Sequence, residues 1–179
     1  MRKFVYALVL LLPITAACDS RYSDEEKFDQ IQKKMIANTD LTKIPANNQL
    51  TNSPYVHGKL AVFQSLQKSD IPLTYFMQPS YYREMKDNYA TTPEEVGTVA
   101  LIDCKVLQKG VYKTDDGKEY PANVEDCNLT LIDRSKQAVI FKKAFEKTPS
   151  QDRTTPGDFV VTQTSQDDIL QFLKGLPRT

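Results

Sequence analysis

The segment from Thr98 to Phe145 constrains the fold more than any other part of the sequence, because it consists of short apolar runs separated by turn residues. Residues 99–102 are apolar at every position, which is typical of a central strand covered on both faces. Residues 115–117, Asp-Asp-Gly, are a hairpin turn signal, and two further strands are expected at 128–132 and 138–141. The pattern predicts an antiparallel β-meander.

Two cysteines flank the hairpin turn. If a four-residue loop, residues 114–117, joins the two strands, counting back along both of them places Cys104 directly opposite Cys127. The same count places Gly110 opposite Pro121. Since neither residue suits a strand interior, we expect the ladder to be broken there.

The amino terminus has the features of a secretory signal peptide. Arg2 and Lys3 provide a positive start, residues 4–12 form an unbroken apolar run, and small residues lead to Cys18. This apolar run is too short to span a bilayer core comfortably, which needs about 20 apolar residues. No later run in the sequence is long enough either. We therefore expect an exported protein whose leader is removed.

The stretch Thr15-Ala16-Ala17-Cys18 resembles the lipobox of bacterial lipoproteins. The resemblance covers residues 1 to about 20, and the mature domain resembles no family of known activity. It implies that the Cys18 sulfur carries a diacylglycerol, that the leader is cut just before Cys18, and that fatty acyl chains hold the protein at the extracytoplasmic, periplasmic face of a cell membrane. Asp19 matches the pattern of lipoproteins that stay at the inner membrane of enteric-type bacteria.

The lipobox fit departs from the family pattern at Thr15, where leucine is usual. The alternative is an ordinary signal peptide, cut at Ala-x-Ala, that leaves Cys18 as a free thiol. An exposed free thiol in an oxidising compartment invites cross-linking, and this favours the lipid.

The charge balance argues against a nucleic-acid partner. The chain has 23 basic and 23 acidic residues, and removal of the leader with Arg2 and Lys3 leaves a small acidic excess. Without a block of Lys or Arg, such a chain is a poor binder of nucleic acid and of anionic lipid. We expect it to meet the membrane through the lipid on Cys18 and to bind another envelope protein.

The cysteine pair that remains after Cys18, Cys104 with Cys127, predicts one structural disulfide in an exported chain. The alternative is a metal or redox pair. A redox motif has the spacing Cys-x-x-Cys, and a zinc site needs more ligands. The sequence also has no Gly-rich phosphate loop and no metal-ligand cluster, so we expect no cofactor.

Helices are predicted at both ends of the mature chain. Ser23 and Glu26 have capping-box spacing and begin a helix that fades near Asn38. The apolar face of this helix consists of Phe28, Ile31, Met35 and Ile36. This face either packs on the protein itself or meets lipid. Ser165 caps a final helix with a broad apolar stripe. We expect this stripe to pack on the sheet, and the alternative is that it docks on a partner. The stripe consists of Ile169, Leu170, Phe172, Leu173 and Leu176.

The fold class is therefore α+β, an antiparallel β-meander with an N-terminal helix and a C-terminal helix packed on the sheet. Residues 18–54 are expected to form a lipid-anchored tether, helix and loop, and residues 55–179 the α+β domain. Further strands are expected at 59–66 and 73–77, and a weak one at 158–164. Residues 80–89 fit a helix turn as well as a loop.

Few residues point to catalysis. His57 is the single histidine, with no nucleophile motif beside it, and is expected at the surface. Asp103 and Asp133 each follow an apolar strand segment; they either converge as a carboxylate pair or start turns, and the second is favoured. The densest aromatic stretch, which serves either a partner or the core, is Tyr75, Phe76, Tyr81, Tyr82 and Tyr89.

Two functions of different classes follow. The first is a non-enzymatic binding or assembly module of the cell envelope, held at a membrane by Cys18. The alternative is an envelope hydrolase that acts through carboxylates, including Asp103 or Asp133. An enzyme of this kind needs a cleft with converging polar side chains, whereas a binding module needs an exposed apolar patch of roughly several hundred Å².

Overall fold

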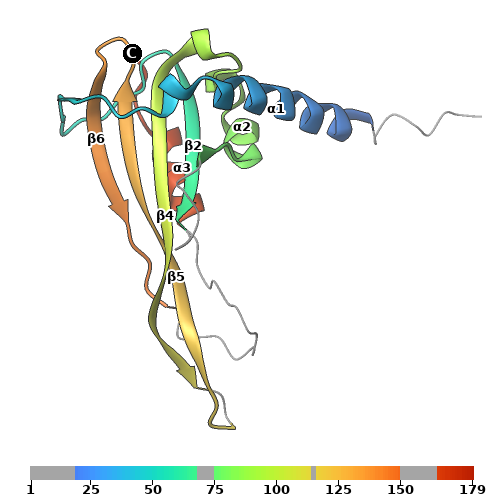
Figure 1. The fold of residues 1–179 in the computed structure, drawn as a ribbon, viewed down its shortest axis with the longest axis vertical. Coiled ribbons are helices and arrows are strands. Elements are labelled where there is room, and N and C mark those ends of the chain that lie inside the picture. Colours follow the sequence, from blue (N-terminus) through green and yellow to red (C-terminus); the bar gives the residue numbers. More distant parts are fainter. Residues whose placement is uncertain (1–18, 68–74, 114–115, 150–164) are drawn as a thin grey trace, which may run out of the picture.

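The computed structural model describes residues 19–67, 75–113, 116–149 and 165–179. Cys18 and the weak strand expected at 158–164 lie outside these residues. Within them the chain folds as α+β, with a mixed sheet of six strands and three α-helices (Figure 1). The α+β class is confirmed.

The sheet has the strand order β1-β6-β5-β4-β2-β3. Its strands are β1 (Asn47–Asn48), β2 (Lys59–Gln67), β3 (Tyr75–Phe76), β4 (Val96–Lys113), β5 (Glu119–Asp133) and β6 (Ala138–Phe145). Strands β4, β5 and β6 form the expected antiparallel meander. However, β2 pairs with β4 in parallel, and β1 pairs with β6 in parallel.

The prediction of a purely antiparallel sheet was therefore wrong. A parallel neighbour requires a crossover, and the segment between β2 and β4 is long enough to supply one that includes a helix. Alternation of apolar residues tells which face of a strand is buried, but it does not tell which strand lies beside it.

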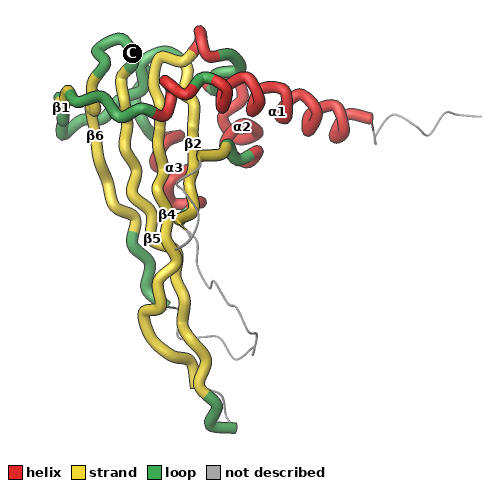
Figure 2. The backbone as a smooth tube through the Cα atoms, in the orientation of Figure 1, coloured by secondary structure: helices red, strands yellow, loops and turns green. Residues whose placement is uncertain are grey.

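The helices partly differ from those expected. They are α1 (Asp19–Ala37), α2 (Pro79–Met85) and α3 (Gln166–Lys174), with 3-10 turns η1 (Thr39–Thr42), η2 (Lys86–Asn88) and η3 (Pro93–Glu95). Helix α1 begins before Ser23, because residues 19–22 contain no proline or glycine that would stop it. Helix α2 has Pro79 in its first turn, a position that proline favours. Figure 2 separates these helices from the strands by colour.

Both faces of the sheet are covered near its centre, where residues 99–102 of β4 are fully buried. On one face, Phe172 of α3 stacks on Phe141 of β6 with ring centroids 5.5 Å apart. On the other face, the segment Asp40 to Pro45 lies beside the buried Ile132. This two-sided cover confirms that residues 99–102 belong to a central strand.

The terminal helices complete one hydrophobic core. Phe28, Ile31 and Met35 of α1 are buried in the same cluster as the sheet residues, whereas Ile36 is 38% exposed. The apolar face of α1 therefore packs on the protein itself. The stripe of α3 packs on the sheet as expected, with Ile169 and Leu173 fully buried.

Strands β4 and β5 extend beyond their neighbours as a two-stranded ribbon, which projects away from the helices (Figure 1). We call residues 106–113 with 119–126 the ribbon and the rest of the sheet the body. The last pairs of the body are Gln67 with Lys105 and Phe145 with Cys127. The ladder shifts register between Gln108 and Val111, so the break expected near Gly110 is present.

Candidate functional site

The disulfide lies where the body narrows into the ribbon. Cys104 and Cys127 are register partners and are bonded to each other, with their Cα atoms 4.1 Å apart. Both side chains are almost completely buried. The predicted disulfide is confirmed in this structure. It links the two central strands at the point where β2 and β6 cease to support them.

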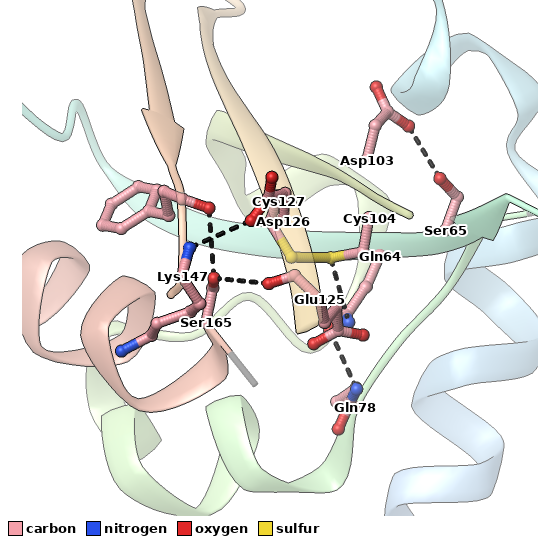
Figure 3. Close-up of a disulfide and its surroundings, with 11 residues drawn as sticks. Gln64, Ser65, Gln78, Asp103, Cys104, Glu125, Asp126, Cys127, Lys147 and Ser165 are labelled. Atoms are coloured by element: carbon pink, nitrogen blue, oxygen red, sulfur yellow. Dashed lines mark hydrogen bonds between the residues drawn. A yellow bond between two sulfur atoms is a disulfide. The ribbon is translucent and has the colours of Figure 1, made fainter. Parts of the chain in front are cut away.

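A chain of three glutamines joins this disulfide to the helices, and Figure 3 shows its first two members, Gln64 and Gln78. Gln64 donates from Nε2 to the Cys104 sulfur at 3.5 Å, and Gln78 donates from Nε2 to the Gln64 carbonyl at 2.8 Å. Gln166 then donates to the Gln78 carbonyl at 2.9 Å and to Ser80 Oγ at 2.6 Å. The chain thus connects β2 with the starts of α2 and α3, and it satisfies amides that would be costly to bury unpaired.

Ser165 occupies the N-cap position of α3, as expected from the sequence, but its side chain makes no capping hydrogen bond. Its Oγ instead lies within hydrogen-bond distance of two carbonyl oxygens, that of Glu125 at 3.0 Å and that of Phe145 at 3.1 Å. Because Ser165 is fully buried, its hydroxyl satisfies a carbonyl within β5 and the carbonyl at the end of β6 rather than the helix.

Glu125 lies beside the disulfide, and the charge of its carboxyl acts on the Tyr81 hydroxyl. Burial raises the pKa of the half-buried Glu125 carboxyl. The Tyr81 hydroxyl is buried without a hydrogen-bond partner among the described residues. Burial, with the charges of Glu125 and Asp167, raises its pKa as well.

A metal ion would need thiolates at this position. One carboxylate oxygen of Glu125 and both sulfurs lie within 4.8 Å of one another. In the disulfide, however, the sulfurs carry no thiolate charge with which to bind a metal. The oxidised cluster is thus a structural element that ties the ribbon, the body and two helices together.

Asp103 and Asp133 do not converge. Thr98 is the register partner of Asp133, and it lies an odd number of residues from Asp103 on the same strand. The two carboxylates therefore project from opposite faces of the sheet and from different levels along it. The carboxylate pair that a glycosidase-like site needs is absent at these positions.

Each of these aspartates has a local structural role. Asp103 accepts hydrogen bonds from Ser65 at 2.7 Å and from Tyr75 at 2.9 Å. Asp133 accepts bonds from Tyr55 and from Ser135, and so holds the turn between β5 and β6. Burial of Asp133 acts to raise its pKa, but the hydrogen bonds outweigh burial and hold that pKa below its usual value. The turn role favoured from the sequence is confirmed for Asp133.

The other candidate residues divide between surface and core. His57 is exposed, as expected, and its backbone N–H donates to Thr98 Oγ1 at 2.8 Å. Of the aromatic stretch, Tyr81 and Tyr89 are fully buried and belong to the core. The members that remain partly exposed are Tyr75, Phe76 and Tyr82.

An open hollow of about 360 Å³ lies between α1 and α2. The sequence alone did not reveal it, because its two walls are separated by about 50 residues. It is lined by Asp24, Glu25, Phe28 and Asp29 from α1 and by Pro79, Tyr82 and Arg83 from α2. Phe28 and Tyr82 form its aromatic part, with ring centroids 5.6 Å apart.

Comparisons with known proteins add little. No family model matches the sequence, and no curated protein matches it. Among solved structures, protein XCC0632 from Xanthomonas campestris, described as DUF330, is 19% identical over 60% of this chain and 78% of that chain. The TM-score is 0.26, so this overlay is too loose to indicate a shared fold. Among the described residues, no helix is both long and apolar enough to cross a membrane.

Proposed function

We propose that this protein is a lipid-anchored binding or assembly module on the extracytoplasmic face of a bacterial cell membrane, without catalytic activity of its own. The observation that carries the proposal is the sequence of the amino terminus, in which a short apolar leader and small residues run directly into Cys18. Acyl chains on Cys18 supply the attachment, and Asp19 favours the inner membrane.

Two structural findings support this role. The cysteine pair forms a disulfide, which suits a protein that matures in an oxidising compartment. Helix α1 begins at Asp19, directly after the proposed acylation site, and packs on the domain through Phe28, Ile31 and Met35. The domain would therefore lie close to the membrane. We expect its partner to be another envelope protein.

The test is the replacement Cys18→Ser in the producing cell. One acyl chain alone binds membranes reversibly, so stable attachment requires the complete lipid. We expect the variant to leave the membrane fraction or to accumulate with its leader uncut. The matched control is the double variant Cys104→Ser with Cys127→Ser, which should remain in the membrane fraction. A Cys18→Ser protein that is processed and still sediments with membranes contradicts the proposal.

Crosslinking in intact cells tests the partner. Reagent-linked complexes of the anchored protein, identified by mass spectrometry, should contain a second envelope protein in reproducible yield. Recovery of the uncrosslinked chain alone, under conditions that capture a known envelope complex, argues against the assembly role.

A further inference from the structure

The hollow between α1 and α2 carries opposite charges on its two walls. On α1, three carboxylates line the hollow, those of Asp24, Glu25 and Asp29. Glu25 and Asp29 are four residues apart and so share one face of the helix. The α2 wall contributes the guanidinium of Arg83. All four charged side chains belong to exposed residues. One wall therefore attracts a cation and the other attracts an anion.

The facing charges do not neutralise each other. Within the part of the chain that the structure describes, no ion pair within 4.0 Å joins Arg83 to a carboxylate. Asp24 has only a long contact of 4.0 Å with Lys27, and both of those side chains are largely exposed. Such a surface pair is worth little. The gap between the walls is thus wide enough to separate a guanidinium from three carboxylates that would otherwise pair with it.

Aromatic and aliphatic carbon lines the hollow between the charges. Phe28 is 4% exposed, so its ring forms the buried part of the lining, and the half-buried Tyr82 ring lies against it. Pro79 adds aliphatic surface. A methylene group can pack on such rings, and an ammonium can lie over the face of one of them. The volume of about 360 Å³ lies at the lower end of the range of small-molecule sites.

Walls of opposite charge suit a ligand that carries both a cation and an anion, and the position of the hollow indicates which kind of ligand it meets. Helix α1 starts at Asp19, the residue after the proposed acylation site, and a helix rises about 1.5 Å per residue, so Asp24 lies only about 7.5 Å along the helix from Asp19. This is comparable with the thickness of one headgroup layer, about 5–8 Å. This step rests on the proposed attachment through Cys18. The hollow would then face lipid headgroups rather than bulk solvent.

We infer that this hollow binds the phosphoethanolamine headgroup of an aminophospholipid. Its primary ammonium, a donor of three hydrogen bonds, lies against the carboxylates of α1. Its phosphodiester lies against Arg83, whose planar fork suits phosphate oxygens. A choline headgroup has no N–H to donate, and a glycerol headgroup has no cation and brings its phosphate toward three carboxylates.

The test is a calorimetric titration of the purified full mature chain, in detergent, with dihexanoyl phospholipids below their micelle concentration. Three probes differ only in the headgroup: ethanolamine, choline and glycerol. We expect the ethanolamine lipid to bind about tenfold more tightly than the other two, since it alone satisfies both walls with charge-assisted hydrogen bonds. Equal affinity for the three lipids, or no binding of the ethanolamine lipid, overturns the inference.

Two variants and two matched controls locate the site. Asp29→Asn and Arg83→Gln should each weaken ethanolamine-lipid binding about tenfold. Asp87→Asn and Lys33→Gln change exposed charges outside the hollow and should leave the affinity unchanged. Unchanged melting temperatures confirm that all four variants fold. Binding that is insensitive to Asp29→Asn and Arg83→Gln contradicts the assignment.

The competing occupant is a cationic side chain of a protein partner. Such an occupant would change the binding in a different direction. A lysine-containing peptide would bind more tightly to Arg83→Gln than to the native protein, because the guanidinium that repels it is gone. The ethanolamine lipid would not compete with that peptide. That result would replace the headgroup by a peptide.

The same titration on Cys18→Ser protein separates this inference from the anchor. If the variant binds the lipid but Cys18 of the native protein is not acylated, only the anchor proposal fails. If Cys18 is acylated and the lipid does not bind, only the headgroup inference fails.

Discussion

The body and the ribbon of this protein are built from the same two strands, but they are stabilised in different ways. In the body, β4 has a neighbour on each side and packed side chains on both faces, and residues 99–102 are fully buried. Towards the tip of the ribbon, β4 and β5 pair only with each other among the described strands, and Val111 is 51% exposed. The disulfide lies at the boundary between the two regions.

This difference shows where each kind of interaction is needed. Hydrophobic burial scales with the apolar area removed from water, so it stabilises the body far more than the ribbon. An isolated two-stranded hairpin is marginal in water. A covalent link at the root keeps the two strands of the ribbon in register without requiring a core beneath them.

The largest expected effect compares one apolar side chain from each region. Leu101→Ala removes a fully buried side chain of the body and should lower the free energy of unfolding by about 2–5 kcal/mol. Val111→Ala in the ribbon should change it by less than about 0.5 kcal/mol. Urea denaturation of the mature chain measures both. Similar losses at the two positions would mean that the ribbon is packed as well as the body.

Removal of the disulfide should have the next largest effect. The cysteines are 23 residues apart, and a loop of this length is worth about 3 kcal/mol in the chain-entropy model. The Cys104→Ser, Cys127→Ser double variant should therefore unfold at a lower urea concentration. Hydrogen exchange should show that ribbon amides lose protection while those of residues 99–102 keep most of theirs. A uniform loss across β4 would show that the bond supports the body instead.

Two glycines provide a smaller contrast. A Cβ on Gly97 would lie 2.2 Å from the backbone oxygen of His57, so Gly97→Ala must displace backbone and should cost about 1–3 kcal/mol. Gly117, at the ribbon turn, has open space around it but a φ of +80°. Gly117→Ala should cost about 1 kcal/mol because of that conformation. Thermal melts compare the two variants. A larger loss of stability for Gly117→Ala than for Gly97→Ala would contradict this expectation.

The smallest effect is a pH dependence of opposite sign at two carboxyl groups. In the body, the pKa of Asp133 is held below 3.8, so its contribution to stability is present at neutral pH and is lost as pH falls through the lowered pKa. At the ribbon, the pKa of Glu125 is raised above 4.5, so its contribution is present in acid and is lost as pH rises through the raised pKa.

Substitution of these two groups makes the signs measurable. Asp133→Asn should lower stability at pH 7 and lose this effect in strong acid. Glu125→Gln should raise stability at pH 7 and make no difference below pH 4.5. Urea midpoints measured from neutral pH down into strong acid record both curves. Curves of the same sign for the two variants would refute the assignment of their environments.

The hairpin shows how far the sequence alone could lead. The pairing of Cys104 with Cys127 was predicted with the correct register, although the assumed loop was too short. Lys113 faces Glu119, so the loop is one residue longer than the four assumed, and the register shift between Gln108 and Val111 compensates for that residue. An Asp-Gly turn marks where a hairpin bends but does not determine how many residues the loop contains.

The polar cluster and the hollow could not be predicted, for a different reason. Gln64, Gln78 and Gln166 are far apart in the sequence, and glutamine is usually a surface residue, so nothing marked them as a connected chain. They meet because the starts of α2 and α3 lie close to β2, and the alternation of apolar residues does not reveal which elements lie side by side. Two local signals of α2 were present, the helix-turn fit of residues 80–89 and Pro79 at the first helical position.

The most direct test of the proposed membrane role is the mass of the mature amino terminus. Protein purified from its native membrane and digested with trypsin should yield a peptide from Cys18 to Arg21 that carries a diacylglyceryl group on the Cys18 sulfur. An unmodified Cys18 peptide, or an amino terminus at any other residue, would contradict attachment through a lipid.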